Sequence, residues 1–419
     1  MNKKIGNLFK GDKVIWMVFF FLCMISIIEV FSASSNLTYK SQNYMGPIIY
    51  HATMIFLGAV VAVVTLNIPC RYFKLMTPFL LIISALTLLW VLIGGESING
   101  ANRVISVLGF TFQPSEIAKG TMVLVTAQIL SAMQRDTGAD RKAFKYIMMI
   151  LVPTTFLIGI ENLSTAALLF AVILLMMFIG RVPMSQMGKL VGGLSILAVI
   201  GLVLIMTLGS VEDTPSAETS MTETVSAEAP AEGDKTSIKG GGIFHRFTTQ
   251  RNRILKFLDR RKVAPEEYDI DENFQVGHAN IAIATSGIIG KGPGNSLERD
   301  YLPQAFSDFI YAIIIEEMGI FGAAFVVFLY IVLLYRAARI ASRCENNFPA
   351  FLIMGLSLLL VIQATFNMMV AVGLAPVTGQ PLPLVSKGGT STIINCAYIG
   401  AILSVSRSAK MKVKEVNKD

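Results

Sequence analysis

The sequence predicts an all-α integral membrane protein with about ten transmembrane helices. Of its 419 residues, 53% are hydrophobic and 15% are charged, whereas soluble domains carry roughly 25% charged residues. Apolar runs of about 18 residues or more recur along the chain, which is the length that a helix needs to cross about 30 Å of hydrocarbon. We therefore treat the bilayer as the solvent for most of the chain.

The apolar runs predict where the helices lie. We expect transmembrane helices 1–7 within residues 1–209, an extracytoplasmic loop over 210–307, helices 8–10 within 308–407 and a cytoplasmic basic tail over 408–419. The expected spans lie near 14–33, 46–67, 75–94, 115–133, 144–161, 163–180, 188–209, 308–335, 349–373 and 388–406.

Lys and Arg residues predict the orientation. They gather in alternate short connections and in the tail, while the other connections hold little beyond Lys40, Arg103 and Lys387. The positive-inside rule then puts both termini in the cytoplasm. The first apolar run resembles a signal peptide, but its length and the spans that follow favour an uncleaved anchor. The net charge of +7 reflects a basic cytoplasmic side that faces anionic lipid, so we predict no nucleic-acid partner.

Cysteine and histidine spacing predicts no metal centre. The four cysteines, Cys23, Cys70, Cys344 and Cys396, form neither a disulfide framework nor a zinc-binding pattern. The three histidines are scattered along the chain.

The long external loop divides into three parts by composition. Residues 211–240 are rich in Ser, Thr, Glu, Ala and Pro, which predicts a disordered insert. Residues 244–262 alternate basic and aliphatic side chains, which is typical of an amphipathic helix on a membrane surface, with a solvated basic stretch as the alternative. Residues 275–296 are apolar but too short to span, so we expect a re-entrant or interfacial segment that ends in a structural glycine turn.

Three acidic residues follow that loop. Asp308 lies at the external mouth of the eighth expected span, where a carboxylate meets both water and hydrocarbon. A helix N-cap is an equally good interpretation of Asp308 from spacing alone. Glu316 and Glu317 follow about 12 Å deeper by helical rise, where ionisable groups are costly unless they are paired or hydrated.

A second charged pair opens the fourth expected span. Glu116 and Lys119 are three residues apart and therefore share one helix face. We expect them either to form an intramembrane ion pair or to line a polar cavity with Glu316 or Glu317. A role in helix packing is as compatible with this pattern as a direct role in chemistry.

Five segments together resemble the SEDS family (shape, elongation, division and sporulation) of FtsW, RodA and SpoVE. They are NGANRVISVLGFTFQPSEIAKG at 99–120, ENLSTA at 161–166, NFQVGHANIAIATSGIIGKGPGNS at 273–296, YLPQAFSDFIYAIIIEEMG at 301–319 and QATFNMMVAVGLAPVTGQPLPLVSKGGTS at 363–391. The wording of ENLSTA and of the GNS turn favours the division branch, that of FtsW, over the elongation branch.

The resemblance implies a function and a set of site residues. The family polymerises lipid II into glycan strands at the inner membrane, together with a single-span class B penicillin-binding protein, and we expect the septum to be the site of action. Asp308 matches the family's essential external aspartate. Gly379 also falls on a matching motif position. The residues that we expect to bind substrate are Arg103, Glu116, Lys119, Gln275, Glu316, Glu317, Gln363, Asn367, Thr378, Ser386 and Lys387.

The chain departs from the family pattern at several positions. Gln304, Phe306 and Ser307 stand where Glu, His and Thr are usual, and Lys387 stands where Tyr is usual. Many relatives carry Asp at the position of Asn162. The residues at 162 and 304 each remove a carboxylate, which counts against a mechanism that needs several.

The reaction that the resemblance implies inverts the anomeric carbon of a lipid-linked strand. It calls for a base on the acceptor sugar, for which we choose Asp308, and for cations on the departing diphosphate. Candidates for the cations are Arg103, Lys119, Lys387, the basic stretch 244–262 or a divalent ion (Mg²⁺ or Mn²⁺); no other cofactor is expected. A lipid II flippase or transporter and a non-catalytic scaffold of the division complex are the alternative functions.

Overall fold

The computed structural model describes residues 10–33, 46–94, 96–98, 101–107, 110–136, 138–208, 274–302 and 307–416. The chain forms two compact units, residues 1–188 with 265–419 and residues 189–264. The first unit is a helical bundle that contains almost every residue of the site predicted above.

Helices dominate the described residues, and ten of them have 17 residues or more. They are α2 (Lys13–Ala33), α4 (Gly46–Asn67), α5 (Cys70–Gly94), α6 (Pro114–Ala132), α7 (Arg141–Glu161), α8 (Leu163–Ile179), α9 (Met184–Leu208), α12 (Ile310–Ala341), α13 (Asn347–Ala371) and α14 (Thr390–Val416). A shorter helix, α11 (Phe274–Thr285), and a 3₁₀ turn, η1 (Glu298–Asp300), precede α12.

Each of the ten long helices coincides with an expected span, with shifts at the ends. The helix α5 begins at Cys70, five residues earlier than expected, and α14 continues to Val416 through most of the basic tail. Six of the helices, α2, α4, α5, α7, α12 and α13, are long and apolar enough to cross a bilayer, and α8 is apolar but shorter. The chain is thus a mostly helical, multi-pass membrane protein, while the count of ten spans stays a prediction. The predicted insert 211–240 and amphipathic helix 244–262 lie outside the described residues.

The connection before α6 adds short strands to the predicted all-α fold. This connection folds into an antiparallel sheet of three strands, β1 (Glu96–Ile98), β2 (Ala101–Val107) and β3 (Phe110–Phe112). Ile98 pairs with Ala101, so Asn99-Gly100 separates the first two strands, and this dipeptide is a strong hairpin signal. A second short hairpin, β4 (Gln134–Arg135) and β5 (Gly138–Ala139), joins α6 to α7.

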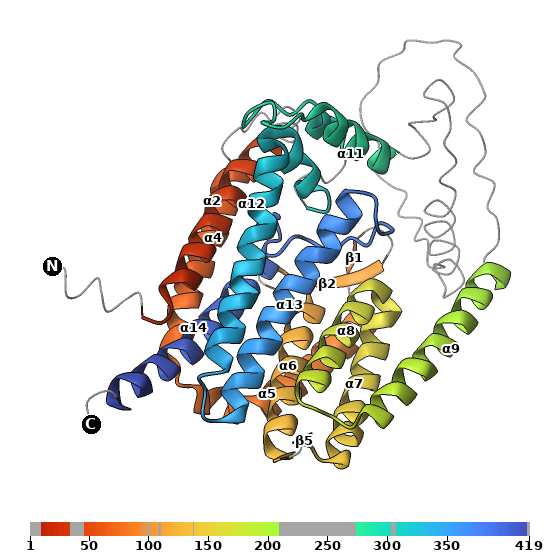
Figure 1. The fold of residues 1–419 in the computed structure, drawn as a ribbon. Helices are drawn as coiled ribbons and strands as arrows, with labels where there is room; N and C mark the ends of the chain where they lie inside the picture. Colours follow the sequence, from red (N-terminus) through yellow and green to blue (C-terminus); the bar gives the residue numbers. More distant parts are fainter. Residues whose placement is uncertain are drawn as a thin grey trace, which may run out of the picture. The chain divides into compact units, whose positions relative to one another are not determined.

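The central helices of the bundle are α6, α12 and α13. Helix α13 packs against α12, α6, α8 and α14, and α12 also packs against α2 (Figure 1). At one end of the bundle, Asp12 connects three helices. Its carboxylate caps α2 by accepting from the Val14 amide and forms an ion pair with Arg336 of α12, and its amide donates to Ser406 Oγ of α14 at 2.9 Å. At the other end, α11 lies across the start of α12 (Figure 1).

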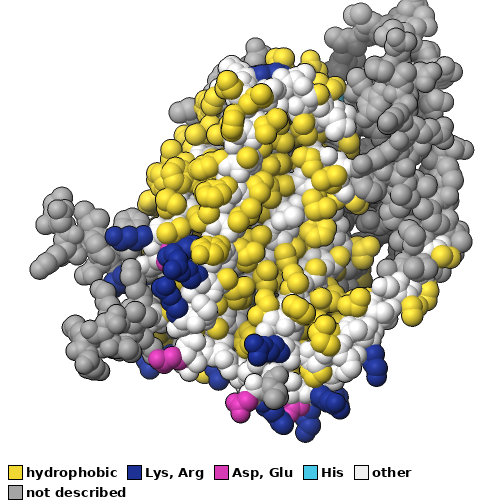
Figure 2. All heavy atoms as spheres, in the orientation of Figure 1, with side chains coloured by type: hydrophobic (Ala, Val, Ile, Leu, Met, Phe, Trp, Pro, Cys, Tyr) yellow, Lys and Arg dark blue, Asp and Glu magenta, His cyan; other side chains and the backbone are white. Residues whose placement is uncertain are grey.

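The surface of the bundle is apolar over a broad band. Figure 2 shows hydrophobic side chains across the face that carries α12, with most Lys and Arg side chains toward the end away from α11. On α12, Phe321 is 71% exposed and Phe328 is 57% exposed. Large aromatic side chains are this exposed along a whole helix face where lipid, rather than water, covers them.

Helix α12 is broken at Gly319. The backbone there has φ 66°, outside the helical range, so residues 310–318 and 320–341 are two helical sections. The carbonyl groups of Glu316 and Glu317 accept hydrogen bonds from the amides of Lys291 (2.9 Å) and Gly292 (2.8 Å) instead of from their own helix. We name residues 288–299 the strap. Because buried backbone groups need hydrogen-bond partners, the strap stabilises the break by supplying them to these two carbonyls.

Gly290 and Gly319 allow the strap to approach the break. Both have positive φ, and a Cβ on Gly319 would overlap the carbonyl oxygen of Ile288. The structure thus confirms that the glycines after α11 serve a structural turn.

We predict that Gly319→Ala lowers the melting temperature in detergent by more than Gly287→Ala does. Gly287 has nearly the same φ, 67°, but open space where its Cβ would lie, so it is a matched control for backbone strain of about 1–3 kcal/mol. Differential scanning fluorimetry of the two purified variants checks this. Equal shifts would show that the close approach at Gly319 does not matter.

Candidate active site

The site is organised around residues 380–386, which we name the central loop. The loop follows α13 and is almost entirely buried, with Leu384 in the left-handed region at φ 66°. Four surrounding helices and one turn hold it by hydrogen bonds. The contacts are Gln363 Nε2 to the Pro381 carbonyl (3.1 Å), Asn367 Nδ2 to the Gln380 carbonyl (2.7 Å), Gln380 Nε2 to Thr165 Oγ1 (2.7 Å), Ser26 Oγ to the Val385 carbonyl (2.7 Å), Ser386 Oγ to the Ser307 carbonyl (2.6 Å) and Tyr330 to the Pro383 carbonyl.

Asp308 is attached to this loop through its backbone. Asn367 donates from Nδ2 to the Asp308 carbonyl at 2.9 Å, and Ser386 holds the preceding carbonyl. The Asp308 carboxylate is partly exposed and accepts a hydrogen bond from Ser307 Oγ at 3.1 Å. The N-cap of α12 is Phe309, so Asp308 lies outside the capping position and the N-cap interpretation is wrong.

Glu116 and Lys119 form the ion pair that their spacing predicts. Lys119 Nζ lies 2.8 Å from Glu116 Oε1 and donates to Gln363 Oε1 at 2.7 Å, and both charged side chains are at most 2% exposed. Through Gln363 the pair joins the hydrogen-bond network of the central loop. Of the two alternatives for this pair, the ion pair is confirmed.

Glu316 and Glu317 belong to a different cluster. Glu316 accepts from Lys291 Nζ (2.6 Å), from the Leu297 amide (3.1 Å) and from Ser296 Oγ. Glu317 accepts from the amides of Gly294 (3.0 Å) and Ser296 (3.3 Å) and from Ser32 Oγ, with Arg299 at 3.9 Å. Most hydrogen-bond donors to the two carboxylates therefore belong to the strap.

The remaining predicted residues lie around the network. Lys387 follows Ser386 directly and is partly buried, which lowers the pKa of its ammonium group. Thr378 is buried in the segment before the central loop, Gln275 is partly buried on α11, and Arg103 lies on β2. No described hydrogen bond joins Thr378 or Gln275 to the central loop.

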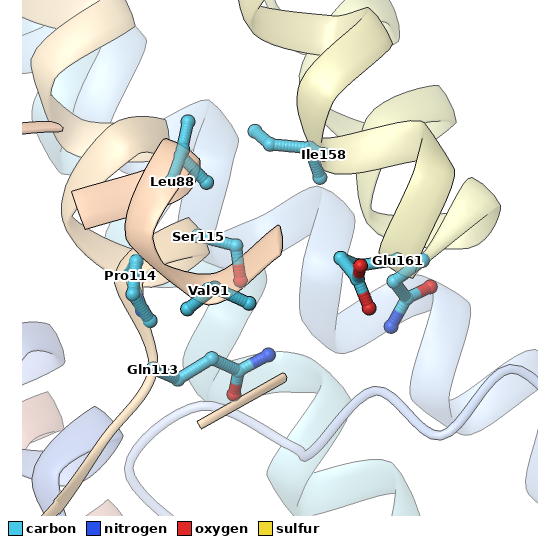
Figure 3. A pocket seen from close by; sticks show the side chains of 8 residues that line it. Leu88, Val91, Gln113, Pro114, Ser115, Ile158 and Glu161 are labelled. Carbon is cyan, nitrogen blue, oxygen red and sulfur yellow. The ribbon is translucent and has the colours of Figure 1, made fainter. Parts of the chain in front are cut away.

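A pocket borders the network where α5, α6 and α7 meet. It is a small hollow, partly open to solvent, between an apolar wall of Leu88, Val91 and Ile158 and the polar residues Gln113, Ser115, Glu161 and Asn162. Figure 3 shows the side chains of Gln113, Ser115 and Glu161 around one space. Asn162 caps α8 by accepting from the Thr165 amide at 3.1 Å, and Thr165 in turn bonds Gln380.

Sequence reasoning missed several residues that hold the site. Ser26 and Ser32 on α2, Gln380 and Tyr330 are polar groups inside apolar runs, and this was the available signal. Lys291 belongs to the segment that the sequence predicts to be a glycine-rich turn, and Arg299 lies just beyond that segment.

Among the described residues, no three His, Cys, Asp or Glu side chains gather in a metal-binding arrangement. The divalent ion therefore stays a prediction from the sequence.

Comparison with known proteins identifies the family. A family model described as cell cycle protein, that of FtsW, RodA and SpoVE, matches residues 12–411. The chain therefore belongs to the FtsW/RodA/SpoVE family.

Relatives and solved structures resemble the chain over most of its length. It is 28% identical over 373 residues to a protein of Idiomarina loihiensis named probable peptidoglycan glycosyltransferase FtsW, with 88% of this chain and 80% of that protein covered. It is 27% identical over 412 residues to the Escherichia coli peptidoglycan glycosyltransferase MrdB, with 97% and 96% covered.

The fold matches a chain of a peptidoglycan synthase complex, whose structure concerns the coordination of polymerization and crosslinking, with a TM-score of 0.68 at 22% identity over 95% of this chain and 98% of that one. It also matches Thermus thermophilus RodA with a TM-score of 0.62 at 19% identity over 96% and 98%.

We predict that Lys119→Met destabilises the protein by about 3–5 kcal/mol, because it leaves the buried Glu116 carboxylate without its cation. The double variant Lys119→Met/Glu116→Gln removes that charge and is expected to recover part of the loss. Thermal unfolding in detergent measures both. A double variant no more stable than the single one would show that the uncompensated charge is not the cause.

Proposed function

We propose that this protein is a peptidoglycan glycosyltransferase that joins lipid II units into β-1,4 glycan strands and releases undecaprenyl diphosphate. The observation that carries the proposal is the position of Asp308, whose backbone is tied to the central loop while its carboxylate is partly exposed and outside the N-cap. Membership of the FtsW/RodA/SpoVE family and relatives named peptidoglycan glycosyltransferase support the same activity.

In the proposed reaction, Asp308 accepts the proton of the acceptor's 4-hydroxyl group. The oxygen forms a bond to the anomeric carbon of the lipid-linked strand while the bond from that carbon to the diphosphate oxygen breaks. The electron pair leaves with the diphosphate, which needs no protonation because it departs as an anion. An α-linked diphosphate becomes a β-1,4 link, so the carbon is inverted. A positioned base contributes about 10²–10⁴-fold to such a reaction.

The leaving group needs positive charge, and Lys387 is our first candidate. Ser386 binds the carbonyl of Ser307, so Lys387 and Asp308 each lie one residue from that hydrogen bond. Lys119 is a poorer candidate than the sequence suggested, because it is fully buried and bound to Glu116 and Gln363. Lys119, Glu116, Gln363, Asn367 and Ser386 then support the site from within.

The residues around the small pocket beside the network can contact the edge of the substrate. Its polar residues can bond hydroxyl or amide groups, and its apolar residues can contact a methyl group. The roles of Arg103, Gln275 and Thr378 in substrate binding remain part of the proposal.

We also propose the topology and setting. The protein has about ten spans with both termini in the cytoplasm, consistent with its Lys and Arg distribution. It acts in septal wall synthesis with a single-span class B penicillin-binding protein. The fold match to a chain of a peptidoglycan synthase complex and the relatives named FtsW favour this setting.

A flippase is the second candidate function, because buried Glu116, Lys119, Glu316 and Glu317 also suit an ion-coupled carrier. Each of these four is held by protein partners, which favours a structural role. Reconstituted protein that moves fluorescent lipid II without forming polymer would support the carrier.

We predict that Asp308→Asn lowers glycan polymerisation by about 10²-fold or more, while folding is kept because the anchoring contacts use the Asp308 backbone. Purified protein with lipid II, and with the cognate transpeptidase where it is needed, is assayed for polymer on gels. Asp136→Asn, an exposed carboxylate between β4 and β5, is the control and keeps wild-type activity. Glycan from the Asp308→Asn variant at the wild-type rate would refute the assignment of the base.

A further inference from the structure

We propose that Lys291, Glu316, Glu317 and Arg299 are positioning residues for Asp308, and that they act through the first section of α12. This inference rests on the proposed role of Asp308 and adds a mechanical requirement to it. None of the four touches the reacting atoms in this scheme.

The break at Gly319 means that the first section of α12 is not held in position by the rest of the helix. A continuous helix would hold Asp308 in a fixed relation to the long section 320–341, which ends in the ion pair with Asp12. At Gly319 the helical geometry stops, and a residue with positive φ between two helical sections is a natural hinge. The section 310–318, which begins two residues after Asp308, therefore needs other contacts to fix its direction.

The strap supplies those contacts at the end of the section that lies opposite Asp308. Its amides at 291 and 292 bond the carbonyls of 316 and 317, which the break leaves without helical partners. Its side chains and amides also saturate the carboxylates of Glu316 and Glu317, both at most 1% exposed. Arg299 donates to Ser32 of α2 at 2.8 Å and to the Gly294 carbonyl at 2.7 Å, so the strap is fastened to a second helix.

The other end of the section is fixed by the central loop, through Asn367 and Ser386. The section is thus held at both ends by groups that belong to different parts of the chain. A loose strap leaves the anchor at Asn367 intact but lets the short section rotate about it. Displacement of a catalytic group by about 1 Å costs about 10²-fold in rate.

The end of the strap is also in contact with α11. His278 on α11 lies with Nδ1 at 2.5 Å from Glu298 Oε2 and stacks on Tyr301 with ring centroids 5.2 Å apart. These contacts connect α11 to the end of the strap, so the position of α11 is linked to that of Asp308 in the proposed scheme.

The test uses Lys291→Met, because the Lys291 side chain is 25% exposed and Glu316 keeps its bonds to Leu297 and Ser296. We expect kcat for polymerisation to fall by about 10- to 100-fold with KM for lipid II changed less than about twofold, and Lys291→Arg to restore at least half of the lost activity on a logarithmic scale. The full chain is used, with its transpeptidase where activity requires it.

Arg336→Met is the matched control. It breaks the ion pair with Asp12 at the opposite end of the same helix, and the Arg336 side chain is also 25% exposed. We expect it to lower the melting temperature without lowering kcat by more than about twofold, because its section is beyond the break. A second pair of variants changes the partner of the strap on α12: Glu317→Gln keeps an acceptor for the strap amides and is expected to lose less activity than Glu317→Ala.

The proposal is overturned if folded Lys291→Met protein keeps the wild-type kcat, or if Lys291→Met and Arg336→Met lose activity in proportion to their melting temperatures. Failure of the proposed base is a separate result, since it is read from Asp308→Asn alone. An inactive Asp308→Asn together with a fully active Lys291→Met would reject the strap and keep the base.

Discussion

The structure depends on hydrogen-bond partners for the backbone groups of its non-helical segments, which lie inside the bundle where water has little access. Two segments leave the helical pattern inside the bundle, the central loop and the break at Gly319. Each unpaired amide or carbonyl there would cost several kcal/mol. Buried polar side chains and the glycine-rich strap remove that cost. The polar residues that look misplaced in an apolar sequence are the partners of this backbone.

This constraint changes the interpretation of the buried charges. The sequence alone allows the four ionisable residues of the predicted spans to line one polar cavity, as in an enzyme site or an ion-coupled carrier. In the structure they divide into the pair Glu116–Lys119 beneath the central loop and the carboxylates Glu316 and Glu317 beneath the strap. Both clusters support the polypeptide that carries Asp308. A general base needs a carboxylate that the substrate can reach and that its surroundings hold in position. Asp308 is partly exposed, and the two clusters hold the segment that carries it.

The same arrangement links α11 to the site. The strap, which follows α11 in the chain, is bonded to the section of α12 that starts beside Asp308. Contacts made on α11 therefore act on a short, separately held section of helix rather than on the whole bundle. The long section 320–341, with its exposed Phe321 and Phe328, is free to meet lipid without disturbing the site.

The sequence by itself determined the helices, since apolar length and Lys and Arg position are local properties that the bilayer imposes on each span. It also determined Asp308 as the candidate base and the ion pair of Glu116 with Lys119, because helical spacing puts that pair on one face. Only the tertiary structure decided the partners of Gln363, Asn367, Ser386, Glu316 and Glu317. Many of those partners are backbone carbonyls and amides, one of them 79 residues away, and every residue type supplies such groups, so the sequence does not show which of them will be used. Other partners are side chains still further along the chain, such as Ser32 for Glu317. The break at Gly319 could not be predicted for the same reason. A glycine in an apolar run can interrupt a helix only where another segment supplies hydrogen-bond donors for the helix carbonyls that lose their partners.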